Sequence, residues 1–326
     1  MEENTTPEQP QRARKLGRIA IYIFAAVGLL FSVLIAVVAL KGKPQAARTF
    51  DANEAIEGVM TRNYGKYSES QQGWLYVDET SRLTYLVTVV QQKKVDGKEG
   101  DELYLVTSGR AIAPMDEEDS FYGVFQLRYR DGQLYEYSDP RRPSGVDPVT
   151  PERVHFEALS ANVWGWVVKT ISNESGVGEH FTTTSNVVLA PRNEQIAVLT
   201  EFTAAFQVLG GGDCKETESL YAAWEKEKGA KKAAAPAEGE GEGEGAQEAS
   251  STESDEEYEI VPPRCTQLQW SYRTDPVTDS TFTPLYITRK AGMQGGAKVD
   301  AKTWKVMFDP KSYTYLMPDE LKNVGS

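Results

Sequence analysis

A run of 22 residues without a charged side chain, Ile19–Leu40, constrains this chain more than any other feature. A helix of that length spans about 33 Å at ~1.5 Å per residue, which is enough to cross the hydrocarbon core of a bilayer. The apolar region of a cleaved signal peptide is shorter, ~7–15 residues. The run therefore predicts a transmembrane helix that serves as an uncleaved signal anchor.

Basic residues flank this run on both sides and indicate its direction. Four precede it and three follow it: Arg12, Arg14, Lys15, Arg18, then Lys41, Lys43 and Arg48. Basic residues gather on the cytoplasmic side of a membrane helix, and a short tail is more economically kept inside than a large body. We therefore expect a single-pass protein of the cytoplasmic (inner) membrane, with its body in the periplasm or outside the cell.

Within the run, small residues recur every four positions at Gly28, Ser32 and Ala36. This spacing places them on one face of a helix, where a second helix can approach closely. Two interpretations remain open. The stripe is a contact with a protein partner or a second copy of the chain, or it is ordinary membrane-helix sequence, in which small residues are common.

The chain carries 35 basic and 48 acidic residues, a net charge of −13. Ten acidic residues lie between Gly229 and Ile260, in a segment of Ala, Gly, Glu and Ser with too few apolar residues to form a core. No basic stripe is present to neutralise phosphates, so nucleic acid is not expected as a partner.

The two cysteines, Cys214 and Cys265, bracket this acidic segment. In an oxidising compartment a disulfide is their natural state, and closing so long a loop stabilises a fold by about 4 kcal/mol. Two buried free thiols, or half of a zinc site, are the alternatives.

Alternating apolar residues predict a mainly β body with minor α. The expected strands are 74–77, 83–90, 103–107, 121–130, 133–138, 155–159, 163–171, 196–209, 266–273, 285–288, 304–308 and 313–316. Asp131-Gly132 is a two-residue hairpin signal. The four prolines between Asp139 and Pro151 predict a loop, and the composition of 196–209 also permits a helix.

Capping patterns predict two short helices. Asp51 and Glu54 have capping-box spacing before a helix that Gly65 ends, and Asp213 and Glu216 have it before a helix that ends near Lys228.

We expect one N-terminal transmembrane helix followed by an antiparallel β sandwich or meander. The predicted division is a disordered cytoplasmic tail (1–18), the transmembrane helix (19–40), a stalk (41–50), the main β-rich domain (51–228), a disordered acidic insert (229–263) and C-terminal strands that complete the same domain (264–320). Two separate domains are the alternative.

No catalytic, cofactor or metal motif stands out. The chain has only two histidines, His155 and His180, and lacks the nucleophile elbow and the zinc-binding spacings. The best local feature is Trp164-Gly165-Trp166, whose indoles share one face of a strand. They form a stacking platform for a glycan, or they are part of the core, which is what most aromatic residues do.

These features favour a non-catalytic binding or assembly protein, anchored in the membrane and exposed in the cell envelope. The alternative is an envelope enzyme, a carboxylate-dependent hydrolase of cell-wall or surface glycan. Such an enzyme needs two carboxylates facing each other across a cleft.

Overall fold

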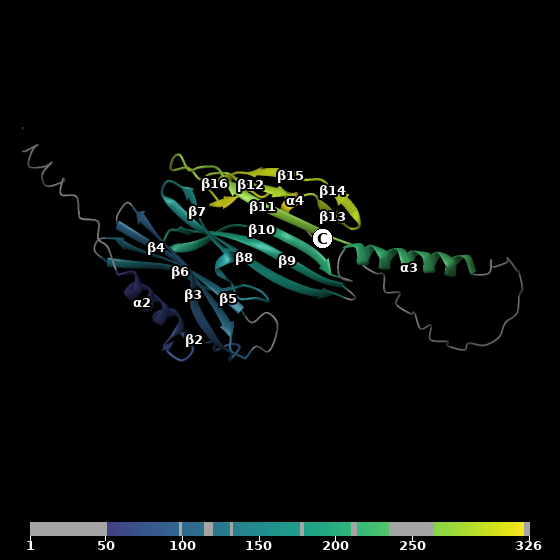
Figure 1. Cartoon of the computed structure of the whole chain (residues 1–326). Helices are drawn as coiled ribbons and strands as arrows, with labels where there is room; N and C mark the ends of the chain where they lie inside the picture. The colour runs from purple at the N-terminus through teal and green to yellow at the C-terminus, as the bar shows by residue number, and fades with distance from the viewer. Residues whose placement is uncertain are drawn as a thin grey trace, which may run out of the picture. The chain divides into compact units, whose positions relative to one another are not determined.

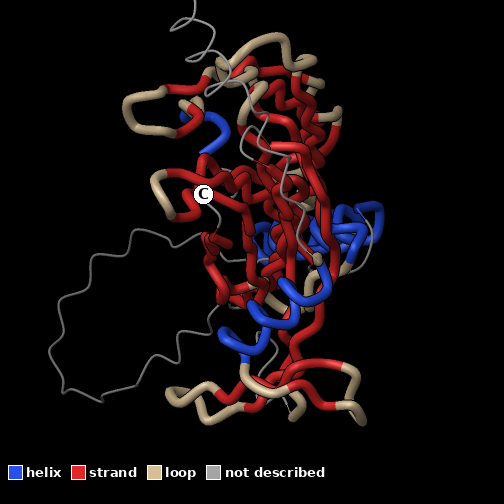
Figure 2. Tube along the Cα trace, turned by 90° about the vertical axis from the view of Figure 1, so that its left-hand side faces the viewer, coloured by secondary structure: helices blue, strands red, loops and turns tan. Residues whose placement is uncertain are grey.

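Alternating apolar residues form antiparallel sheets along most of the chain. The computed structural model describes residues 51–97, 100–113, 120–130, 133–176, 179–209, 214–234 and 264–322. Strands hold 59% of the described residues and helices 17%, so the protein is mainly β, as the sequence predicts. Figure 2, in which strands are red, shows how far they outweigh the helices.

The first sheet is a meander in which each strand pairs with the next along the chain. Its strands are β1 (Tyr67–Ser68), β2 (Gly73–Val77), β3 (Thr84–Gly97), β4 (Gly100–Ala111), β5 (Ser120–Arg130) and β6 (Gln133–Pro143). Arg130 pairs with Gln133, so β5 and β6 are joined across the two residues that the sequence marks as a hairpin turn.

Helix α2 (Ala52–Tyr64) covers one face of this sheet. It begins as predicted: the Asp51 carboxylate accepts hydrogen bonds from the backbone N–H groups of Asn53 and Glu54. It ends at Gly65, whose φ of 94° suits a glycine. Buried apolar residues of the helix pack against those of β3, β4 and β5.

The second sheet begins with another meander and continues into the C-terminal strands. Its strands are β7 (Val154–Ser160), β8 (Val163–Gly176), β9 (Glu179–Arg192), β10 (Gln195–Leu209), β11 (Gln267–Thr274), β12 (Leu285–Arg289), β13 (Gly292–Gln294), β14 (Ala297–Val299) and β15 (Lys302–Val306). The short 3-10 turn η1 (Pro151–Arg153) precedes β7.

The two sheets pack face to face through a shared apolar layer. Tyr104, Val106, Tyr122 and Val124 supply it from the first sheet. The second sheet supplies Val154, Trp166, Val168, Val187 and Leu189. Because side chains alternate along a strand, the neighbours of these residues face outward to α2 on one side and to the C-terminal strands on the other.

The C-terminal strands lie over the outer face of β7–β10 (Figure 1). Leu268, Ile287 and Val306 from β11, β12 and β15 bury themselves against Leu199 and Phe202 of β10. Backbone hydrogen bonds from Thr283 to Leu159 and from Ala161 to Asp279, each 2.8 Å, join the loop after β11 to the end of β7. The small elements β16 (Phe308–Asp309), β17 (Thr314–Tyr315) and α4 (Asp319–Lys322) complete the chain.

A disulfide joins Cys214 to Cys265, with 5.1 Å between the Cα atoms. It ties the start of α3 (Cys214–Ala234) to the residues just before β11. Glu218 reinforces the junction, because its carboxylate accepts a 2.9 Å hydrogen bond from the backbone N–H of Cys265.

Three expectations about local structure were wrong. Strand β9 was not expected, although its polar stretch of threonines suits a strand that is half exposed. The predicted loop at 139–151 begins too early, since β6 runs to Pro143. Because β6 is the edge strand, Pro140 and Pro143 can sit in it without an N–H to donate. Helix α3 passes Lys228 and reaches Ala234, because the alanines and lysines there are good helix formers.

The segment 196–209 is a strand, so its alternative interpretation as a helix is wrong. Within the described ranges, no helix is long and apolar enough to cross a membrane. The predicted transmembrane helix 19–40, with Gly28, Ser32 and Ala36, lies outside the described residues, as do the N-terminal tail, the stalk up to residue 50 and residues 235–263 of the acidic insert.

Gly123, in the middle of β5, is the position where the packing of α2 leaves least room. A Cβ there would stand 2.2 Å from the hydroxyl of Tyr64. That buried hydroxyl donates to the carbonyl of Pro140 at 2.6 Å and lies 2.8 Å from Thr107 Oγ1. We expect Gly123→Ala to displace Tyr64 and lower the free energy of unfolding by about 1–3 kcal/mol, measured by urea denaturation.

Gly229→Ala is the matched control. Apart from the helix's own backbone and the chain neighbours, no atom of the described residues lies within 4 Å of a Cβ at that position in α3, and alanine favours a helix by about 1 kcal/mol. Equal effects of the two substitutions would contradict this account of Gly123.

Candidate functional site

A cleft of about 190 Å³ opens at the end of the layer between the two sheets. The first sheet contributes the ends of β3, β4 and β5, and the second contributes the turn between β7 and β8 and the start of β8. The lining residues are Val95, Asp96, Gly97, Glu102, Arg128, Ala161, Asn162 and Trp164.

Strand register explains why three of these residues meet. Val95 pairs with Glu102, and Glu102 pairs with Arg128, so their side chains form one row across β3, β4 and β5. The next row toward the core holds Tyr104 and Gln126, which also pair. Both rows face the second sheet, so a charged row lies directly beside the buried layer.

The carboxylate of Glu102 is held in place from the core side. Its Oε2 accepts hydrogen bonds from the Tyr104 hydroxyl at 2.9 Å and from Gln126 Nε2 at 2.7 Å. Its Oε1 lies over Gly97, where a Cβ would stand 2.7 Å away. A glycine at this position therefore leaves room for the carboxylate to reach into the cleft.

Arg128 lies opposite Glu102 and is held by β6. Its Nη2 donates to the Tyr137 hydroxyl at 3.0 Å, and its guanidinium lies over the Tyr137 ring, 4.9 Å from the centroid. Its Nε is buried and has no hydrogen-bond partner among the described residues. This N–H is the one donor of the guanidinium that the fold buries without satisfying it.

The two tryptophans of the predicted platform are placed in different surroundings. Both indoles face the first sheet. Trp166 is completely buried, with its ring 5.2 Å from that of Tyr104, so it belongs to the core. Trp164 is partly exposed and lines the cleft, and the ammonium group of Lys93 lies 4.0 Å from its ring centroid. Only Trp164 is therefore available to a ligand.

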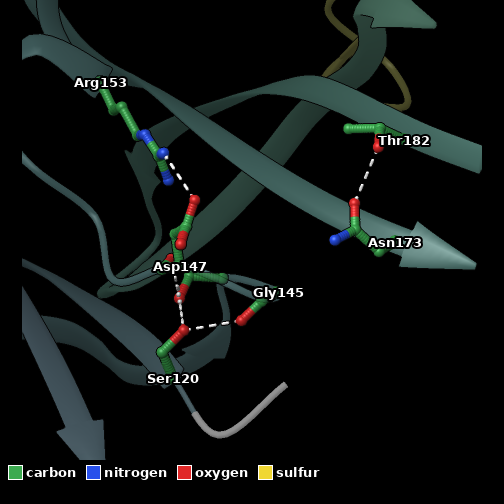
Figure 3. A network of polar contacts seen from close by, with 7 residues as sticks. Ser120, Gly145, Asp147, Arg153, Asn173 and Thr182 are labelled. Atoms are coloured by element: carbon green, nitrogen blue, oxygen red, sulfur yellow. Dashed lines mark hydrogen bonds and ion pairs between the residues drawn. The ribbon is translucent and has the colours of Figure 1, made fainter. Parts of the chain in front are cut away.

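A second polar network, drawn in Figure 3, lies where the chain crosses between the sheets. The Ser120 hydroxyl donates to the carbonyl of Gly145 at 2.7 Å and lies 2.8 Å from the Ser144 hydroxyl. Arg153 pairs with Asp147 at 3.0 Å. Both serine hydroxyls bind backbone carbonyls, which points to a role in fixing the crossing rather than to nucleophilic chemistry.

The two histidines are exposed on strands, His155 on β7 and His180 on β9. Among the described residues, no group of three or more His, Cys, Asp or Glu side chains is arranged to hold a metal ion. A shallower cleft of about 380 Å³ lies beside α2, and its residues are Asn53, Ile56, Glu57, Tyr67, Glu69 and Trp74.

Sequence reasoning missed Glu102, Arg128 and Gln126, although a signal was present. Along β5 the inward positions run Tyr122, Val124, Gln126, Arg128. Polar side chains at the inward positions that follow buried apolar ones indicate where the core ends and a polar binding site can begin. Which strands carry the partners depends on the register, which the sequence does not specify.

The cleft presents fixed acceptors, one unsatisfied donor and an indole, which together suit the binding of a small polar molecule. Comparison with protein families, with characterised proteins and with solved structures finds no match for this chain.

Burial raises the pKa of the tyrosines in the layer between the sheets. It raises that of Tyr122 from 10.0 to about 12, and burial together with the charge of Glu102 raises that of Tyr104 further. The unfolded chain therefore loses these protons first, near pH 10, and stability falls as the pH rises from there toward the folded pKa. We expect each such tyrosine to lower the free energy of unfolding by about 1.4 kcal/mol at pH 11, relative to neutral pH.

Urea denaturation of the protein and of Tyr122→Phe between pH 9 and 11 checks this expectation. The variant has no phenol to ionise at this position, so its stability should fall less steeply, with a difference of about 1.4 kcal/mol at pH 11. Parallel curves would contradict burial of a neutral Tyr122.

Proposed function

We propose that this chain is a non-catalytic binding protein of the cell envelope, held by one N-terminal membrane helix with its body outside the cytoplasm. The disulfide between Cys214 and Cys265 carries the proposal. Disulfides persist in oxidising compartments and are rare in the cytosol. The uncharged run 19–40, with its basic flank, supplies an anchor and a direction.

In this proposal the body is a β sandwich of two antiparallel meanders, and the stripe Gly28, Ser32 and Ala36 joins two anchors or an anchor and a partner helix. The arrangement of the cleft supports binding rather than catalysis. Glu102 accepts two hydrogen bonds on one oxygen, which suits a fixed acceptor.

A glycan hydrolase is the second candidate, because Asp96 and Glu102 line the same cleft. Hydrolysis uses two carboxylates ~5–9.5 Å apart. Incubation with purified cell-wall polysaccharide separates the two functions. A hydrolase releases reducing ends and loses that activity in Glu102→Gln, whereas a binding protein releases none.

Topology tests the leading proposal most simply. A phosphatase that folds only outside the cytoplasm, fused after Ser326, should be active. The same fusion lacking residues 19–40 should be inactive, because nothing would then export the body. Alkylation of acid-quenched cells should label neither cysteine before reduction and both after it. Activity of a cytoplasm-only reporter at Ser326, or labelling without reduction, would contradict the proposal.

A further inference from the structure

In and behind the cleft between the sheets, two polar atoms are buried without a hydrogen-bond partner among the described residues. Nε of Arg128 is one, and Oε1 of Gln126, whose side chain is 3% exposed, lies one row behind it and is another. Leaving a buried donor or acceptor unpaired costs free energy that a bound partner recovers. Arg128 lines the cleft, so a partner that enters it contacts the guanidinium whose Nε the fold leaves unpaired.

The charges around the cleft restrict what that partner can be. Glu102 is negative and Arg128 is positive, so the charges that face the cleft balance, since the exposed Asp96 alternates with Val95 onto the other face of β3. An anion would meet the carboxylate, and a cation would meet the guanidinium. A neutral group that both donates and accepts hydrogen bonds suits this arrangement, and a hydroxyl does both.

The indole and the size of the cleft further restrict the kind of ligand that the cleft can bind. Trp164 adds flat apolar surface beside the hydrogen-bonding groups. Lys93 covers its ring at 4.0 Å, which helps to hold the indole in place. The volume of about 190 Å³ is below the ~300 Å³ at which pockets for drug-sized ligands begin. The cleft therefore admits one small ring rather than a whole oligomer.

We propose that this cleft binds one ring of a neutral sugar within a surface or cell-wall glycan. One hydroxyl donates to Oε1 of Glu102, a hydroxyl accepts from the guanidinium of Arg128, and the carbon face of the ring contacts Trp164. Asn162 at the rim offers a further acceptor and donor. This inference rests on the proposed function and names the class of ligand for the binding protein.

Titration calorimetry of the full chain tests the inference. The chain is placed in phosphatidylcholine nanodiscs, because maltoside detergents carry a sugar. The probes are the tetramers of N-acetylglucosamine, β-1,4-glucose and α-1,4-glucose, with tetraalanine as a peptide. We expect saturable binding of at least one sugar and none of the peptide. Saturation by none of the three sugars, or by tetraalanine instead, would overturn the inference.

Variants connect the binding to the cleft. Arg128→Lys keeps the charge but loses the planar guanidinium with its several donors, and Glu102→Gln keeps the shape but loses the charge, so each should weaken binding at least tenfold. Arg110→Lys, at an exposed position on β4, is the matched control and should bind as the unaltered chain does. Melting temperatures check that each variant folds.

If Trp164→Phe, Arg128→Lys and Glu102→Gln all fold and bind the sugar with unchanged affinity, the site lies elsewhere and the inference fails. The topology of the chain is measured separately. A body that is exported but binds no sugar would leave the proposed function standing without this ligand, whereas a cytoplasmic body would remove the proposed function itself.

Discussion

Burial of one face of each sheet against the other is the interaction on which the rest of this structure depends. Trp166 of β8 and Tyr104 of β4 lie at its centre, both nearly or wholly inaccessible to water. Neither meander has an apolar interior of its own, since a single sheet has two faces and buries each only against another layer. Helix α2 and the C-terminal strands close the two outer faces in the same way.

The cleft follows from this packing. Where the apolar layer ends, the same inward rows continue as Glu102, Gln126 and Arg128, and the register of β4 and β5 aligns them. Tyr104 serves both regions, since its ring packs on Trp166 while its hydroxyl donates to Glu102. A change in how the two sheets pack would therefore move the carboxylate of Glu102 as well as the side chains of the core.

Much of the fold is readable from alternation and capping, as with Asp51, Gly65 and most of the strands. The failures have physical causes. The Thr-rich first half of β9 lacks the alternation of apolar and polar residues that marks a strand. Strand β6 contains prolines because it lies at the edge of its sheet, where a missing N–H is tolerated. The pair Cys214 and Cys265 was predicted from the expected oxidising compartment. The site was harder to predict from the sequence. Trp164 and Trp166 occupy equivalent positions on one strand, and only the sheet that packs over them determines which indole is buried.

The contact between Tyr104 and Trp166 offers the most direct test, through a double-mutant cycle. Stability is measured for the protein, for Tyr104→Leu, for Trp166→Leu and for the double variant. An aromatic pair at the 5.2 Å seen here should give a coupling of about 1 kcal/mol. Effects that add to within about 0.3 kcal/mol would show that the two residues do not touch, and would contradict the packing of the sheets.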